Sequence, residues 1–437
     1  MADADTPFAP HVLDLVAAGE RPSDAAEALQ RATVSAVEVA PRVHIIQPSI
    51  VNVYVLETDE GLVLIDCGLA RDADVVYGAV RDRFDAPLHT VIFTHGHLDH
   101  CFGLTRFLDA GERPQVVAHE NVQRRFETYL RTPRLNAIAN QRQWQLPELP
   151  WAPASRDDFV WPDVTYRDEL ELRIGGEVFR CRHGMGETDD HTWVWIPGRR
   201  TLASGDFFCR TMPNCGNPNK VLRYPEEWAA ADEEMAALGA ELLLPGHGEP
   251  IHGAEQIRTG LLEQAEFLHA IVDQTLEGLN RGLRHDQIVR SIQVPALLAG
   301  LEHLQPTYDR PEFIARNVIR RYGGWFDGYA ADLLPASGEE IGTEVAGLAG
   351  GVAALVARAR ALAATNLPLA CHLAEWAYLA APDDDAACQC VIELFTARAD
   401  ADPSLMSKGV YRHLVRRADG TYDPTRELGP PPPRPGA

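Results

Sequence analysis

The stretch from Thr94 to His100 concentrates side chains that bind metal ions. It reads Thr-His-Gly-His-Leu-Asp-His and directly follows an apolar run. At the end of a strand, the first two histidines can face one point while Asp99 and His100 reach a second point nearby. Imidazole and carboxylate groups without paired thiolates are typical of a hydrolytic Zn²⁺, Mn²⁺ or Fe site. The stretch therefore predicts a metal cradle; the alternative is a histidine-rich surface turn.

Further ligands must come from later in the chain, because one stretch fills only part of two coordination spheres. Three segments offer them, each next to a predicted short strand: residues 183–191, 203–206 and 242–248. They read His-Gly-Met-Gly-Glu-Thr-Asp-Asp-His, Ala-Ser-Gly-Asp and Leu-Leu-Leu-Pro-Gly-His-Gly. Each potential ligand is thus expected at the end of a strand.

In this order the four motifs resemble those of the metallo-β-lactamase fold superfamily, over roughly residues 43 to 255. The resemblance implies two Zn²⁺ ions per chain, with Mn²⁺ or Fe as alternatives, bridged by the carboxylate of Asp206. Asp99 and Asp206 are the implied catalytic residues. The implied metal ligands are His95, His97, Asp99, His100, Glu187, Asp206 and His247.

Glu187 departs from the commonest form of this pattern, in which a histidine follows the glycine. A carboxylate keeps the ligand count, adds negative charge and favours a harder ion. The alkyl sulfatases of the superfamily also have Glu at this point. The alternative ligands are His183 and His191, of which His191 is the better because it immediately precedes a predicted strand.

The C-terminal half carries a second resemblance. Residues 320–328 read Arg-Arg-Tyr-Gly-Gly-Trp-Phe-Asp-Gly and resemble the signature of the alkyl sulfatase dimerisation domain, and the helical pattern through about residue 415 is similar to that domain. A homodimer is implied, since exposed apolar helix faces are costly and a two-fold interface covers them. The alternative is that these helices pack only on their own metal domain. A sterol-carrier-like module, found in many alkyl sulfatases, is not expected after this domain.

Alternating strand and helix signals, with ligands at strand ends, predict an α/β fold: an αββα metallo-β-lactamase-like sandwich followed by an all-α domain. The expected parts are a helical lead-in at 1–32, the metal-hydrolase domain at 33–300, the helical dimerisation domain at 301–415, and a Pro-rich, disordered tail at 416–437. An insertion at 121–153, rich in Trp and Pro near its end, is expected to wall a substrate pocket or else to cover the sheet.

The composition limits the classes of binding partner that are expected. The 437 residues include 63 acidic and 40 basic side chains, and the net charge of −23 argues against nucleic acid or an anionic membrane. No run of about 18 apolar residues and no secretory signal is seen, so the protein is expected in the cytoplasm, with its eight cysteines reduced.

The resemblance implies a dinuclear metal-dependent hydrolase that uses a metal-bridging hydroxide on an ester-type bond of a small apolar substrate, with a sulfate ester favoured. The alternative is a carboxylic ester, lactone or thioester hydrolase, because the bridging position holds Asp206 where alkyl sulfatases have Glu. Charge-assisted hydrogen bonds from the loop after Asp206 are expected to hold a substrate anion. Its candidate residues are Arg210, Asn214, Asn217 and Arg223. The alternative is a rigid Asn/Gly/Pro loop in which Arg223 pairs with a surface carboxylate.

Overall fold

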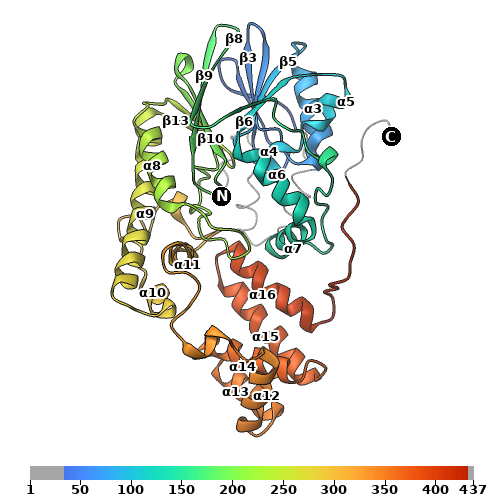
Figure 1. Cartoon of the computed structure of the whole chain (residues 1–437), viewed down its shortest axis with the longest axis vertical. Coiled ribbons are helices and arrows are strands. Elements are labelled where there is room, and N and C mark those ends of the chain that lie inside the picture. Colours follow the sequence, from blue (N-terminus) through green and yellow to red (C-terminus); the bar gives the residue numbers. More distant parts are fainter. Residues whose placement is uncertain (1–33, 432–437) are drawn as a thin grey trace.

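Two β-sheets form the centre of the larger, N-terminal part of the molecule (Figure 1). The computed structural model describes residues 34–431. The helical lead-in expected at 1–32 and the last six residues of the expected tail lie outside the described residues.

The first sheet has seven strands in sequence order. Its first four strands are antiparallel, whereas β4 to β7 run parallel and are joined by helical crossovers, as parallel strands require. The strands are β1 (Val37–Ala40), β2 (Val43–Ile46), β3 (Val53–Thr58), β4 (Gly61–Ile65), β5 (Leu88–Ile92), β6 (Gln115–His119) and β7 (Val164–Tyr166). The helices of the crossovers are α3 (Ala73–Arg83), α4 (Leu98–Cys101), α5 (Thr105–Asp109), α6 (Asn121–Arg131) and α7 (Pro133–Trp144).

The second sheet has six strands in the order β13-β12-β11-β10-β9-β8. Only β11 and β12 are parallel, and α8 (Pro225–Ala236) connects them. The strands are β8 (Glu169–Ile174), β9 (Glu177–Gly184), β10 (His191–Ile196), β11 (Thr201–Gly205), β12 (Leu242–Pro245) and β13 (Ile251–His252). Every residue of β10 is buried, because the strand lies in the middle of the sheet.

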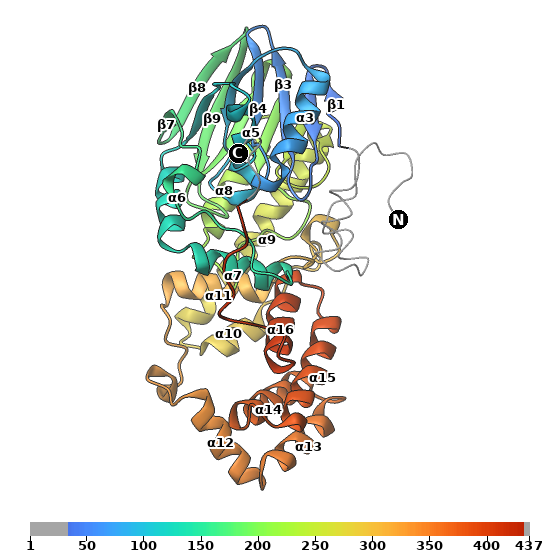
Figure 2. The same cartoon turned by 90° about the vertical axis from the view of Figure 1, so that its right-hand side faces the viewer.

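The core is layered. Side chains of both sheets, such as Ile65 and Val117 from the first and Phe179 and Leu244 from the second, share one buried cluster. Helix α3 covers the outer face of the first sheet, while α8 and α9 (Ala254–Asn280) cover that of the second. In Figure 1 the two sheets lie between α8 and α9 on the left and α3 on the right, and Figure 2 shows the molecule from the α3 side. The predicted αββα sandwich is confirmed.

Three of the parallel strands bring the ligand motifs together. Strand β5 leads into His95, β11 leads into Asp206, and β12 leads into His247. Because the carboxyl ends of parallel strands open on one edge of a sheet, and the two sheets lie face to face, the three motifs meet between the sheets at that edge.

The C-terminal part is helical and lies at the lower end of Figure 1. Helices α12 to α16 share their own alanine-rich core, which includes Ala359, Ala374 and Val391. The helices are α10 (His285–Ser291), α11 (Pro311–Tyr322), α12 (Gly338–Ala349), α13 (Val352–Leu362), α14 (Leu367–Ala380), α15 (Asp385–Ala401) and α16 (Leu405–Ala418). The predicted all-α domain after the sandwich is thereby confirmed.

The segment after α16 returns to the sandwich domain in an extended conformation. The amide of Gly429 donates to the carbonyl of Leu149 at 3.0 Å, and Arg426 donates to the carbonyl of Pro147 at 3.2 Å. Helix α16 itself continues to Ala418, two residues beyond the expected start of the tail at 416. Among the described residues, no single helix is long and apolar enough to cross a membrane, and only α12 and α13 together, bent by 87°, meet that test.

Candidate functional site

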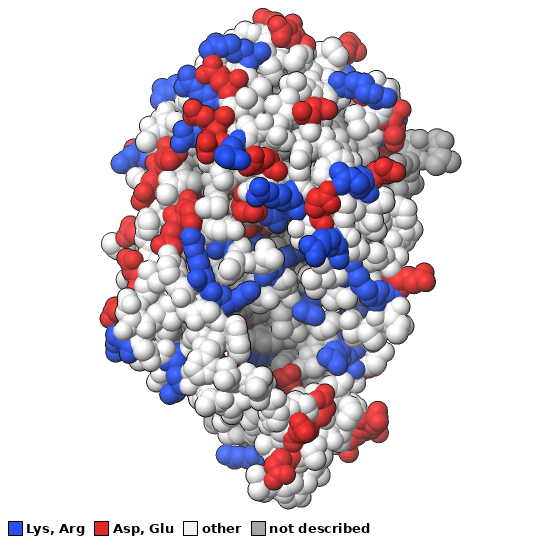
Figure 3. Space-filling view, in the orientation of Figure 1, with Lys and Arg blue, Asp and Glu red and all other residues white. Residues whose placement is uncertain are grey.

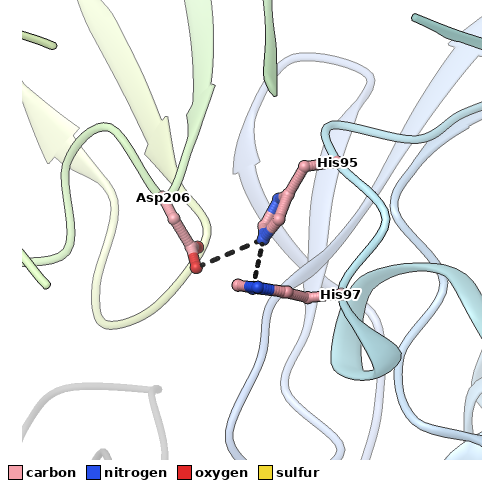
Figure 4. Close-up of side chains that lie close together, drawn as sticks. All are labelled: His95, His97 and Asp206. Atoms are coloured by element: carbon pink, nitrogen blue, oxygen red, sulfur yellow. Dashed lines mark hydrogen bonds and ion pairs between the residues drawn. The ribbon is translucent and has the colours of Figure 1, made fainter. Parts of the chain in front are cut away.

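The first group of metal-binding side chains joins the two sheets. His95 and His97 lie in the loop after β5, and Asp206 follows β11 (Figure 4). His95 Nε2 is 2.9 Å from His97 Nδ1 and 3.7 Å from Asp206 Oδ2. His95 and Asp206 are buried, so these donor atoms are held close together away from bulk solvent. This arrangement is suited to a cation.

The second group lies on the other side of the same carboxylate. It consists of Asp99, His100 and His247. Asp99 Oδ2 is 3.6 Å from the Nε2 atoms of both histidines. Asp206 Oδ1 is 3.4 Å from His100 Nε2 and 3.3 Å from His247 Nε2. Asp206 therefore turns one oxygen toward each group.

The protonation of the histidines fits metal binding. Burial lowers the pKa of His95 and of His97 well below the usual value, so both rings are neutral and offer lone pairs. His100 Nδ1 donates to Asp66 at 2.7 Å, and His247 Nδ1 donates to the carbonyl of Ile50. Against the effect of burial, the charge of Asp206 raises the pKa of His100 well above its usual value and that of His247 to about 9. Because Nδ1 of each ring keeps its bond, a cation would replace the proton on Nε2, the nitrogen that faces the second group.

Two buried polar atoms of the ligand groups also need a hydrogen-bond partner or an ion. His100 Nε2 and Asp206 Oδ1 make no well-formed hydrogen bond to any described residue. Buried polar atoms normally have a hydrogen-bond partner. The charges of His247 and His100 lower the pKa of Asp206 well below its usual value, against the effect of burial. An ionised carboxylate between two sets of imidazole nitrogens fits a pair of divalent cations.

Several polar side chains that the ligand motifs do not contain hold the ligand loops in place. Asp66, at the end of β4, accepts from the amide and the hydroxyl of Thr94, each at 2.7 Å. Asn52 Nδ2 donates to the carbonyls of Pro245 and Gly248 at 2.9 and 2.7 Å. The sequence reasoning assigned these residues no role. The available signal was a polar residue, Asn52, among the apolar residues leading into β3.

Glu187 lies in the loop between β9 and β10. Its Oε1 is 3.6 Å from His97 Nδ1, accepts from Asn214 Nδ2 at 2.6 Å and forms an ion pair with Arg223. Burial raises the pKa of Glu187 to about 7, although the guanidinium of Arg223 opposes this shift. A carboxyl oxygen of Glu187 therefore lies beside the first group.

The alternative third ligands are differently engaged. His191 Nε2 accepts from the amide of Asp206 at 3.1 Å, and its ring stacks on Phe207 with centroids 4.3 Å apart. His183 stacks on His119 at 3.7 Å and donates to the carbonyl of Asp189. The geometry favours Glu187, because its Oε1 lies 3.6 Å from His97 Nδ1, whereas Nε2 of His191 already accepts from the amide of Asp206.

The residues predicted to bind an anion are largely occupied by protein partners. Arg223 is only 2% exposed; it pairs with Glu187 and donates to the carbonyl of Asn214 at 2.8 Å. Asn217 Nδ2 donates to Gln143 Oε1 at 2.9 Å. These three loop residues line a cavity beside the ligand groups, whereas Arg210 pairs with Glu249 at 3.4 Å and is not part of the lining.

This cavity has a volume of about 280 Å³ and reaches members of both ligand groups. One side is apolar and includes Leu98, Phe102 and Trp151. The insertion at 121–153 contributes much of the wall through α7, so the structure shows it as a wall of this cavity. Figure 3 shows Lys and Arg side chains gathered around a hollow between the two parts of the molecule.

The layered fold, with His and Asp side chains gathered between its two sheets, defines a protein of the metallo-β-lactamase type. The family model of the metallo-beta-lactamase superfamily matches residues 46–247, and that of alkyl sulfatase dimerisation matches residues 284–419. The sandwich domain is thus of the metallo-beta-lactamase superfamily, and the helical domain is an alkyl sulfatase dimerisation domain.

Curated relatives agree with this division. A linear primary-alkylsulfatase of Pseudomonas sp. (strain ATCC 19151) is 27% identical over 68% of this chain and 60% of its own length. An (R)-specific secondary-alkylsulfatase of Pseudomonas sp. is 24% identical over 71% of this chain and 51% of its own. The chain thus spans between half and two thirds of the length of these relatives.

A solved structure shows the same fold. The stereoselective inverting sec-alkylsulfatase from Pseudomonas sp. superimposes with a TM-score of 0.78 at 21% identity, over 90% of this chain and 66% of that chain. The agreement extends across both the sandwich and the helical part, because it covers most of this chain.

Proposed function

We propose that this protein is a dinuclear metal-dependent hydrolase that cleaves sulfate esters of small apolar alcohols. The observation that carries the proposal is the position of Asp206, which turns one oxygen toward each of two groups of ligands beside a partly apolar cavity. Alkylsulfatases among the relatives of this chain support sulfate as the leaving group.

The proposed ligands divide into two sets that share Asp206. His95, His97 and Glu187 hold one ion, while Asp99, His100 and His247 hold the other. Two Zn²⁺ ions, or Mn²⁺ or Fe, would supply Lewis acidity toward the ester and would activate water as a nucleophile at neutral pH. Asp66 keeps His100 in the tautomer that the site needs.

Among the described residues that line the cavity, none offers a better nucleophile. Cys209 lines it, but burial raises the pKa of this thiol well above the usual value, so the thiol stays protonated. Leu98, Phe102 and Trp151 exclude water and receive a hydrocarbon chain. The role of the residues around the ions is therefore to position the substrate and exclude bulk water.

A substrate panel on metal-reconstituted protein tests the proposal. We expect about two equivalents of Zn²⁺ per chain by elemental analysis, and a higher kcat/KM for hexyl sulfate than for hexyl acetate, a γ-lactone or a hexanoyl thioester. One metal equivalent or none after reconstitution contradicts the dinuclear site. Faster turnover of the carboxylic ester, lactone or thioester contradicts the sulfatase proposal and supports the other hydrolase.

A further inference from the structure

Lysine is almost absent from this chain. Of its 40 basic residues, 38 are arginines and only two are lysines, Lys220 and Lys408. Lys220 belongs to the loop between Asp206 and α8, and its side chain lines the cavity beside the ligand groups. A compact ammonium therefore occurs in the cavity of a protein whose basic residues are almost all arginines.

This ammonium has no counter-charge in contact with it. Lys220 Nζ donates to Asn140 Oδ1 at 2.8 Å, and no carboxylate of the described residues lies within 4 Å of it. Arg223, its cationic neighbour in the same loop, is by contrast neutralised by Glu187. An ammonium has three N–H donors, so Lys220 keeps donors for a ligand.

The helix that faces Lys220 supplies a second free donor. Asn140 accepts from Lys220 and donates through Nδ2 to Asn136 Oδ1 at 3.1 Å, one turn earlier on the same face of α7. Asn136 Nδ2 ends this chain of hydrogen bonds; it is buried and has no partner among the described residues. Asn136 is 8% exposed and also lines the cavity. An unpartnered buried donor costs free energy unless a ligand satisfies it.

Lys220 lies close enough to the ligand groups for its charge to act on them. It is among the charges that lower the pKa of His97, and the carboxylates of Glu187 and Asp99 act on Lys220 in turn. Burial lowers the pKa of Lys220 to about 8, so the amine still carries a proton at neutral pH. The side chain of Lys220 also lines the same cavity as His97, Asp99 and Glu187.

We propose that Lys220, together with the amide of Asn136, holds the oxyanion of the substrate, so that the cavity selects sulfate esters over neutral esters. The inference rests on the proposed function, because it assigns the sulfate recognition that such a hydrolase needs. It also replaces Arg223, whose charge is neutralised by Glu187, as the main anion contact. Lys220 is here a substrate-binding residue and takes no part in holding the metal ions.

Binding to a non-hydrolysable probe tests the inference without turnover. Calorimetry with hexane-1-sulfonate on Zn²⁺-reconstituted protein should show roughly 10- to 100-fold weaker binding to Lys220→Met than to the wild type. The sulfonate affinity of Lys220→Arg, which keeps the charge, should lie between those of Lys220→Met and the wild type. Lys408→Met, which removes the other lysine, in α16, should bind the sulfonate as tightly as the wild type does. Affinity for neutral 1-hexanol should change much less.

Kinetics with hexyl sulfate separate this inference from the proposed function. If the wild type does not hydrolyse hexyl sulfate, the sulfatase proposal fails, and the sulfonate titration still decides the role of Lys220. If the wild type is active and the KM of Lys220→Met rises roughly 10- to 100-fold, the sulfatase proposal and the role of Lys220 are both supported. Equal sulfonate affinity of Lys220→Met and the wild type, with matching metal content and melting temperature, overturns the inference.

Discussion

At the scale of single residues, both ligand groups depend on one carboxylate. Asp206 is 4% exposed, and its two oxygens lie 3.3 to 3.7 Å from nitrogens of His95, His100 and His247. The other ligands each serve one group. Loss of this side chain should therefore affect both ions, whereas loss of another ligand should affect mainly one.

Asp206→Ala should reduce the metal content from about two equivalents to less than one, because both coordination sets lose a ligand and the imidazoles lose their charge partner. Elemental analysis after identical reconstitution and desalting measures this. Asp59→Ala, at a carboxylate that is 78% exposed, is the matched control and should keep both ions. Retention of one full equivalent in Asp206→Ala would show that Asp206 serves a single ion.

The third ligand of the first ion can be decided by a pair of variants. Glu187→Gln should weaken the binding of one ion by roughly 10- to 100-fold, since the amide keeps the bond to Asn214 but loses the charge. His191→Ala should have a smaller effect, because its Nε2 accepts from the backbone of Asp206. Competition with a chromophoric chelator measures both affinities, and the reverse order of effects would identify His191 as the ligand.

At the scale of elements, α7 links the cavity to the helical part of the chain. Its inner face carries Asn136 and Asn140 into the cavity, while its other side contacts α16. Arg412 of α16 donates to Gln145 at 2.6 Å, and Arg416 donates to the carbonyl of Leu146 at 2.7 Å. The position of the cavity wall therefore depends on a helix of the dimerisation domain.

Gly409 sets the distance between these two helices. A Cβ added there would lie 2.4 Å from the carbonyl oxygen of Arg142, so α16 or α7 would have to move. Gly409→Ala should cost about 1–3 kcal/mol of stability and reduce kcat/KM while metal content stays unchanged. Gly347→Ala, in α12 with open space at the added carbon, should be neutral or stabilising by about 0.5–1 kcal/mol. Equal melting temperatures and equal kinetics for the two variants would contradict this account.

The packing of α8 against α9 makes stability depend on pH. Asp232 of α8 is fully buried; burial raises its pKa well above the usual value, although a hydrogen bond from Gln264 opposes the shift. The folded protein then keeps a proton that the unfolded chain releases above about pH 4. This group's contribution to the free energy of unfolding therefore falls as pH rises from about 4 toward the folded-state pKa.

Asp232→Asn, which is neutral at every pH, should not show this fall. The difference in melting temperature between Asp232→Asn and the wild type should increase from pH 4 to pH 8. At neutral pH the free energy of unfolding of the variant should exceed that of the wild type by about 1–3 kcal/mol. Thermal unfolding of both proteins across this range measures the difference, and Asp59→Asn is the exposed control. A constant difference at all pH values would mean that Asp232 is ionised in the folded protein throughout.

At the scale of the whole molecule, the helical part exposes apolar side chains. Trp325 is 70% exposed, Leu334 90% and Leu348 81%. They lie within the segment that matches the alkyl sulfatase dimerisation model. Large exposed apolar side chains are candidates for an interface, and a two-fold interface between identical chains is the commonest arrangement.

We expect light scattering to give about twice the 48.1 kDa of one chain. Replacing both Leu334 and Leu348 by Glu should produce a monomer with unchanged metal content, because a buried carboxylate is costly in an interface. Leu135→Glu, at a residue that is 64% exposed and lies outside the segment that matches the dimerisation model, should leave the dimer intact. A monodisperse wild-type monomer at micromolar concentration would contradict the dimer.

By itself, the sequence determined the class of fold and the ligand types, because both depend on local patterns. Apolar runs of strand length end at His95, Asp206 and His247, and parallel strands must open on one edge of a sheet. The same local logic indicated the helical domain and its apolar faces.

Only the tertiary structure decided which charges remain free in the cavity. Arg223 pairs with Glu187, 36 residues earlier, and Lys220 meets Asn140 across 80 residues of chain. Such pairings depend on how loops cross between the sheets, and no periodicity in the sequence encodes them. The neighbouring cations Arg223 and Lys220 look equivalent in the sequence. In the structure, the buried carboxylate of Glu187 neutralises Arg223, whereas Lys220 is left to bind a ligand. The difference arises because a buried charge depends on its nearest partner.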